Sequence, residues 1–276
     1  MKNVMVANLR NKNKKKYDSD RLITLIKAQI ENSLQFGWTP EDIIMLTNFE
    51  FSYMGVKAVP IKLNNFCFTG SKVFGVKWLM DNTEFEGPFW CHDLDAWQNA
   101  PIECPKFKDA GFAQYSRPKI NGGVQFWRHS GQDILDKIVD TLIKNEAARE
   151  EPTLDKFCMN NKRVTMLNSK YNVGCSGFIP RYERADEHPV KVCHFHPDNR
   201  IAWQTHVLDR NAYGIRSVTP ELETVVRKYY PNLQTELDSE GKNRQMEHLT
   251  DRAKIKPKHI DRTKALIKEY RNSTVS

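Results

Sequence analysis

Two aspartates and a histidine carry the clearest chemical signal in the sequence. Asp93 and Asp95 stand two residues apart, directly after the predicted buried strand 88–92. His194 ends a second run with alternating apolar residues, 190–193. Carboxylate oxygens suit Mg²⁺, and an added imidazole suits Mn²⁺. The pattern therefore predicts a divalent-metal site able to neutralise a diphosphate, with His196 as the alternative to His194.

A structural interpretation competes with this one. Asp-x-Asp pairs are common in solvated loops, and neighbouring histidines are often surface or core residues. Asp93, Asp95 and His194 would then be structural in a noncatalytic nucleic-acid-binding α/β protein. The position after a strand favours the metal site, because ligands in open α/β folds bind beyond the carboxyl ends of parallel strands.

The segments around these residues predict a βαβ unit. Strand 4–9 leads into a Lys-rich loop, 10–16, and then into a helix capped by Asp18 or Ser19 and ending near Gly37, before strand 42–47. Such a unit implies parallel strands with a right-handed crossover. Further patterns predict helices over 70–80, 134–143 and up to 157, and strands at 88–92, 112–115, 121–127, 164–167 and 190–195.

Composition excludes several classes of protein. The 276 residues carry 42 Lys+Arg against 34 Asp+Glu, a formal charge of +8, with an ordinary share of apolar residues. We expect no transmembrane helix and no secretory signal, since no apolar run is long enough. The six cysteines show no CxxC spacing, which predicts reduced thiols in the cytoplasm, the host cytoplasm for a viral protein.

The C-terminal part differs in charge from the rest. Residues 242–271 hold ten Lys and Arg against four Asp and Glu, with apolar residues at helical spacing. We expect a main domain over 1–215 and a basic helical segment over 216–276. Such a segment can bind nucleic acid or an anionic membrane surface, or can simply be a solvated helix.

Taken together, these motifs resemble GT-A-fold glycosyltransferases. The shared features are the strand–loop–helix–strand unit, a helix containing Lys72, and the stretches 89–95, 121–127, 167–173 and 192–195, in the same order over residues 3–200. The resemblance implies a Rossmann-like, mostly parallel mixed sheet flanked by helices. It also implies metal-dependent transfer of a sugar from a nucleotide-diphosphate donor to a hydroxyl acceptor.

The resemblance assigns roles to individual residues. Asp95 binds the metal, His194 is the third ligand, and Asp93 contacts the ribose and also the metal. The residues implied to bind the donor are Ala7, Asn8, Asp18, Lys72, Asp93, Asn121, Gly122, Gly123 and Arg200, with Lys191 as an alternative to Arg200 at the diphosphate. The stretch 121–123 can also be a hairpin turn.

Two further acids are candidates for a catalytic base. Glu151 and Asp155 begin the helix that follows strand 121–127, where this fold presents acids to an acceptor hydroxyl, as an inverting mechanism requires. Alternatively, they complement the dipole at a helix N-terminus. The stereochemical outcome stays open.

The acceptor is inferred from the basic C-terminal segment and from the overall composition of the chain. A compact, Lys- and Asn-rich sequence without a signal is similar to phage enzymes that glycosylate hydroxymethylated pyrimidines in DNA. We therefore expect DNA as the acceptor, with a base extruded into the pocket. Glycan, lipid and protein acceptors are the alternatives.

Overall fold

A seven-stranded mixed sheet forms the centre of the computed structural model, which describes residues 1–9, 17–63, 70–116, 119–146, 149–174, 190–195 and 219–231. The order across the sheet is β10 (Val164–Leu167), β8 (Ala110–Ser116), β9 (Lys119–Trp127), β6 (Phe89–His92), β1 (Lys2–Ala7), β2 (Ile43–Thr47) and β5 (Val59–Pro60). Strands β6, β1, β2 and β5 are parallel, whereas β9 runs antiparallel between β6 and β8, and β10 is parallel to β8.

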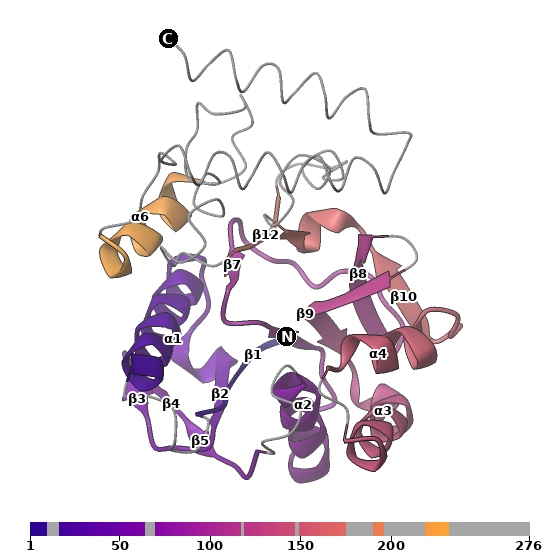
Figure 1. The fold of residues 1–276 in the computed structure, drawn as a ribbon. Coiled ribbons are helices and arrows are strands. Elements are labelled where there is room, and N and C mark those ends of the chain that lie inside the picture. Colours follow the sequence, from indigo (N-terminus) through magenta and orange to yellow (C-terminus); the bar gives the residue numbers. More distant parts are fainter. Residues whose placement is uncertain are drawn as a thin grey trace, which may run out of the picture.

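Helices cover both faces of this sheet. The helices α2 (Ser71–Asn82), α3 (Gln132–Lys144) and α4 (Glu151–Cys158) pack on one face, and α1 (Tyr17–Gln35) packs on the other. Side chains alternate along β1, so that Val4 and Val6 face α2 while Met5 and Ala7 face α1. Figure 1 shows α2, α3 and α4 grouped together and α1 apart from them. The expected α/β class is confirmed.

A second, three-stranded sheet lies on the α1 side. Its order is β11 (Val173–Gly174), β12 (Val192–His194) and β7 (Ala96–Gln98), with β7 antiparallel to β12. Ala96 and Val192 of this sheet pack on Trp90, Val124 and Phe126 of the main sheet. The sequence pattern indicated β12 but not β7, a three-residue strand too short for its periodicity to register.

The helix α6 (Pro220–Tyr229) packs against α1, beside which Figure 1 draws it. The Glu31 carboxylate of α1 accepts hydrogen bonds from Lys228 (2.6 Å) and Tyr229 of α6. It also accepts one from Tyr53 (2.6 Å) in the small hairpin of β3 (Ser52–Tyr53) and β4 (Val56–Lys57). The predicted boundary at 215 and the basic stretch 242–271 lie outside the described residues.

The predicted element ends shift in two places near the N-terminus. The first strand ends at Ala7 rather than residue 9. The first helix begins at Tyr17, so Asp18 and Ser19 already have helical backbone and the predicted capping role is wrong.

Two predictions from composition concern cysteines and membranes. The described cysteines, Cys91, Cys104, Cys158 and Cys193, are free thiols, as predicted. Burial raises the pKa of Cys91 and Cys193 to about 12, so both are inert at neutral pH.

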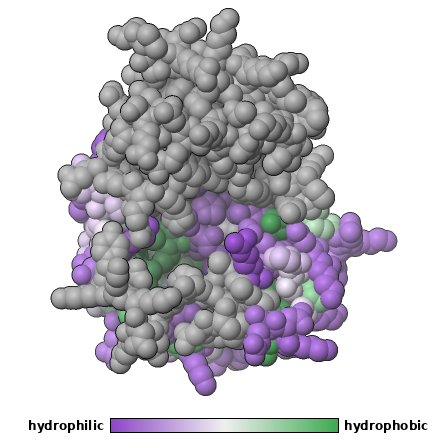
Figure 2. Space-filling view, in the orientation of Figure 1, coloured by the Kyte–Doolittle hydropathy of each residue, from purple (hydrophilic) through white to green (hydrophobic). Residues whose placement is uncertain are grey.

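None of the described helices is both long and apolar enough to span a bilayer. The described surface in Figure 2 is mostly hydrophilic.

Candidate functional site

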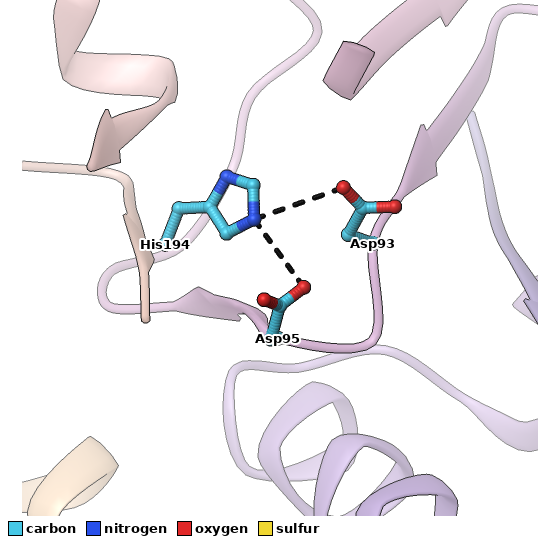
Figure 3. A group of neighbouring side chains, drawn as sticks. All are labelled: Asp93, Asp95 and His194. Atoms are coloured by element: carbon cyan, nitrogen blue, oxygen red, sulfur yellow. Dashed lines mark ion pairs between the residues drawn. The ribbon is translucent and has the colours of Figure 1, made fainter. Parts of the chain in front are cut away.

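The three predicted metal ligands converge at the carboxyl end of β6. The chain leaves β6 at His92 and turns, with the Ala96 amide donating to the Asp93 carbonyl (3.0 Å). It then continues as β7, in which Ala96 lies opposite His194 of β12. This pairing brings His194 Nε2 to 3.3 Å from Asp95 Oδ1 and 3.7 Å from Asp93 Oδ2 (Figure 3).

The donor set fits a divalent cation. One ligand atom from each of Asp93, Asp95 and His194 can be chosen so that all lie within 4.8 Å of one another. Ligands held at about 2.1 Å from one ion lie roughly 3–4 Å apart, so small side-chain movements suffice. The side chains are 32%, 12% and 16% exposed, which leaves an ion a path to them. Two oxygens with one imidazole nitrogen favour Mn²⁺ over Mg²⁺.

Buried polar residues of α1 hold the turn that carries the aspartates. Gln29 donates to the carbonyl oxygen of Leu94 (2.8 Å), the residue between them. Asn32 exchanges hydrogen bonds with the backbone of Gln98 at 2.8 and 2.9 Å. Both amides are fully buried, on the helix stripe that faces the protein interior. Their bonds to the backbone explain why polar residues interrupt an apolar stripe.

A pocket of about 490 Å³ opens beside the three ligands. This volume is within the range of small-molecule sites. Predicted residues that line it are Ala7, Asn8, Lys72, Asp93, Asp95, Gly123, Glu151 and His194. Lining residues that the sequence analysis did not single out include Leu22, Leu25, Ser71, Arg149 and Glu150.

The pocket wall is electronegative. Its acids are Asp93, Asp95, Glu150 and Glu151, and its lysine and arginine are Lys72 and Arg149. With all of these ionised and His194 neutral, four negative charges face two positive ones, which leaves an excess of two among the described residues. A bound divalent cation would balance that excess.

Lys72 is a buried cation between two carboxylates. Its ammonium donates to Asp93 Oδ1 and lies 3.3 Å from Glu150 Oε1, and the residue is 4% exposed. Burial disfavours the charged form, but the charges of Asp93 and Glu150 outweigh it and raise the pKa of Lys72 above its ordinary value. Lys72 therefore stays charged and fixes the Asp93 oxygen that does not face His194.

The two predicted catalytic acids lie in different surroundings. Glu151 lines the pocket, and burial together with the charge of Glu150 raises its pKa above 4.5. Asp155 Oδ1 accepts a hydrogen bond from the backbone amide of Ile120 (2.7 Å) and is not among the described residues that line the pocket. The geometry thus brings Glu151, but not Asp155, to the metal ligands.

The stretch 121–123 lies inside β9 and is not a hairpin turn. A Cβ on Gly123 would come within 2.2 Å of the His194 ring, and one on Gly122 within 2.7 Å of Glu150 Oε1. The glycines therefore make room for two side chains of the site. This reason differs from the role that the resemblance implied, which was binding of the donor.

Replacing Gly123 by alanine tests this packing. The added methyl group must displace the His194 ring, and overpacking of this kind costs about 1–3 kcal/mol. We expect roughly a 10- to 100-fold loss of Mn²⁺ affinity, measured by electron paramagnetic resonance of free Mn²⁺. Gly111→Ala on β8 is the control, because its Cβ would meet Leu167 at 3.1 Å, far less severely. Equal Mn²⁺ affinity in Gly123→Ala and wild type would contradict the prediction.

Of the remaining predicted residues, the structure describes Lys191 and Asn121, and neither is among the described residues that line the pocket. Arg200, His196 and the side chain of Asp18 lie outside the described residues. Lys191 Nζ donates to the carbonyl oxygen of Pro101 (2.8 Å) and does not line the pocket. Asn121 donates to Glu151 Oε1 (3.3 Å), and Glu151 does line the pocket.

Some contributors gave no recognisable signal in the sequence. Glu150 adjoins the predicted Glu151 and differs from it only in being buried against Lys72. Leu22 and Leu25 belong to the apolar stripe of α1 and read as core residues. Asn172, by contrast, lies in the stretch 167–173 that carries the family resemblance, but its contact with His194 Nδ1 (3.1 Å) arises only in the folded chain.

No protein-family model and no curated protein sequence matches the chain. Several solved structures match its fold. The glycosyltransferase GlyE of Streptococcus pneumoniae TIGR4 gives a TM-score of 0.50 at 12% identity, over 83% of this chain. The match spans 63% of the GlyE chain. The galactosyltransferase LgtC, crystallised with donor and acceptor sugar analogs, gives 0.50 at 12% identity, over 87% of this chain and 98% of LgtC. An active-site variant of LgtC gives the same values. The chain thus has the GT-A fold, as the sequence predicted.

Proposed function

We propose that the protein is a metal-dependent glycosyltransferase that moves a sugar from a nucleotide-diphosphate donor to a hydroxyl acceptor. The observation that carries the proposal is the convergence of Asp93, Asp95 and His194 at one pocket. The GT-A fold supports it, because LgtC and GlyE have this fold and are glycosyltransferases.

Different residues around the pocket would bind the metal, the nucleoside and the diphosphate of the donor. Asp93 Oδ2, Asp95 Oδ1 and His194 Nε2 would hold Mn²⁺ or Mg²⁺, which would stabilise negative charge on the leaving diphosphate. Ala7, Leu22 and Leu25 give an apolar wall for the nucleoside. Asn8 lines the same side, where its amide donates to Ser71 Oγ (3.1 Å). Arg149, exposed at the pocket, is a basic group available to the diphosphate.

The proposal is tested by incubating the full chain with individual nucleotide sugars and Mn²⁺. We expect hydrolysis to release the nucleoside diphosphate with at least one donor, and to stop when the metal is chelated. The absence of release and of binding for every common nucleotide sugar would contradict the proposal. It would favour the noncatalytic nucleic-acid-binding protein instead.

Glu151 is the proposed base for the acceptor hydroxyl. Because its pKa is raised, activity should fall with decreasing pH at a value above 4.5, where Glu151 becomes protonated. Replacement by glutamine should lower kcat by about 10²–10⁴-fold and remove that acidic limb of the pH–rate profile. Asp155→Asn is the comparison variant, since this carboxylate binds Ile120 and should affect stability while retaining the limb. An unchanged pH–rate profile in Glu151→Gln would exclude Glu151 as the general base.

For the acceptor we propose DNA containing hydroxymethylated pyrimidines. Support comes from sequence alone, from the ten Lys and Arg in 242–271. Mass spectrometry of such DNA after incubation with donor would detect the added sugar. Binding that is insensitive to salt, or to deletion of 242–276, would remove this argument and favour a glycan, lipid or protein acceptor.

A further inference from the structure

Two asparagine side chains connect the imidazole of His194 to the carboxylate of Glu151. His194 Nδ1 lies 3.1 Å from Asn172 Oδ1, and Asn172 Nδ2 lies 2.7 Å from Asn121 Oδ1. Asn121 Nδ2 in turn lies 3.3 Å from Glu151 Oε1. The four side chains come from β12, the turn before β11, β9 and α4. They form one chain of hydrogen bonds behind the candidate metal centre.

A backbone amide fixes the direction of every bond in this chain. The Gly123 N–H donates to Asn121 Oδ1 (2.9 Å), and a backbone amide can only donate. Asn121 Oδ1 is therefore an acceptor, so Asn172 must direct its NH₂ group towards it. Asn172 Oδ1 is then left facing His194. Because this oxygen only accepts, His194 Nδ1 must carry a proton.

The protonated Nδ1 determines what the other ring nitrogen does. In the neutral imidazole, a proton on Nδ1 leaves a lone pair on Nε2. Nε2 faces Asp95 Oδ1 at 3.3 Å and Asp93 Oδ2 at 3.7 Å. Three electron-rich atoms then converge with no proton between them, an arrangement that a cation stabilises and that would otherwise be repulsive.

We infer that Asn172 is a positioning residue that selects the metal-binding tautomer of His194, an inference that rests on the proposed function. Asn172 is 8% exposed, its backbone N–H donates to the Ser169 carbonyl (2.9 Å), and its side chain is held by the hydrogen bond to Asn121 (2.7 Å). The Gly123 Cα packs against the same ring. Partners of this kind orient metal-ligating imidazoles and influence metal affinity by about 10–100-fold. The chain also ties Glu151 to the same amides.

The tautomer is measurable without metal and without activity. Nitrogen-15 correlation spectra of the metal-free full chain at about pH 8 distinguish the two neutral tautomers of His194, assigned by loss of its signals in His194→Gln. We expect the Nδ1–H form in the wild type and a shift towards the Nε2–H form in Asn172→Leu. Finding the Nε2–H form in the wild type would overturn the inference, and this measurement needs no folded Asn172 variant.

Mn²⁺ binding, followed by electron paramagnetic resonance, gives the second readout. Asn172→Leu should bind Mn²⁺ about 10–100-fold more weakly. Asn172→Asp keeps an acceptor for His194 Nδ1 but loses the donor to Asn121 Oδ1, so its loss of affinity should be smaller than that of Asn172→Leu. Asn168→Ala is the control, because Asn168 caps the same turn through the Lys170 amide (2.9 Å) without contacting His194. Unchanged Mn²⁺ affinity in Asn172→Leu would overturn the inference about Asn172 but not the proposed metal centre. Absence of Mn²⁺ binding by the wild type would overturn the proposed metal centre itself.

Discussion

Replacing Asp95 by asparagine should abolish metal-dependent cleavage of the donor. The substitution removes the carboxylate whose Oδ1 lies 3.3 Å from His194 Nε2. A metal that stabilises a leaving phosphate contributes several kcal/mol, so we expect turnover to fall by about 10³-fold or more. Release of nucleoside diphosphate and the affinity for Mn²⁺ should both decline. The fold should persist, as judged by circular dichroism.

Asp136→Asn on α3 is the matched control for this experiment. Asp136 is an aspartate in a surface ion pair with Lys77 (2.6 Å), away from the pocket lining, and such pairs contribute little. Its turnover should equal that of the wild type. Wild-type turnover in Asp95→Asn would show that the acid pair has a structural role only.

Replacing Lys72 by methionine should cause the largest loss of folding stability among the pocket residues. Lys72 is buried between Asp93 and Glu150, and Glu150 is itself 3% exposed. Removing one partner of a buried pair leaves a buried charge uncompensated and costs about 3–5 kcal/mol. The free energy of unfolding, measured by urea titration, should decrease by this amount. Lys72→Met with Glu150→Gln should recover part of the loss, because both charges are then absent.

The dependence of this effect on pH follows from the raised pKa of Lys72. Its stabilising contribution is complete below the unfolded-state value of 10.5 and is lost as the pH rises through the higher folded-state pKa. The difference between wild type and Lys72→Met should therefore stay constant from neutral pH to about pH 10.

Lys77→Met on the same helix is the control for Lys72. Its ammonium is 29% exposed and pairs with Asp81 and Asp136, so we expect a loss below about 1 kcal/mol. Equal losses in the two variants would mean that burial of the Lys72 pair has no energetic consequence.

The sequence was sufficient to predict the fold class and the grouping of the three candidate metal ligands. Strands with long apolar or alternating runs, such as β1, β2 and β6, were identified because burial on a sheet imposes those patterns. The Asp-x-Asp pair and His194 were recognised by residue type and by position after a strand. The convergence of these distant side chains, which the prediction required, is present in the structure.

What the sequence did not reveal depends on tertiary contacts. β7 has only three residues, yet its pairing with β12 is what brings His194 beside Asp95. Gly122 and Gly123 were recognised as small, but the side chains that fill the space next to them could not be known. Glu150 and Glu151 are adjacent identical residues, and only burial distinguishes the partner of Lys72 from the candidate base.

The candidate ligands come from two segments of the chain. His194 lies in β12 of the three-stranded sheet, whereas the aspartates lie in the turn that connects β6 of the seven-stranded sheet to β7. An ion shared between them would act as a cross-link, and β12 could then open only by giving up a coordination bond. Occupancy of the site should accordingly slow amide hydrogen exchange in 192–194 before it changes the global unfolding transition. The rate of local opening of the three-stranded sheet would therefore report the fraction of protein that has a metal bound.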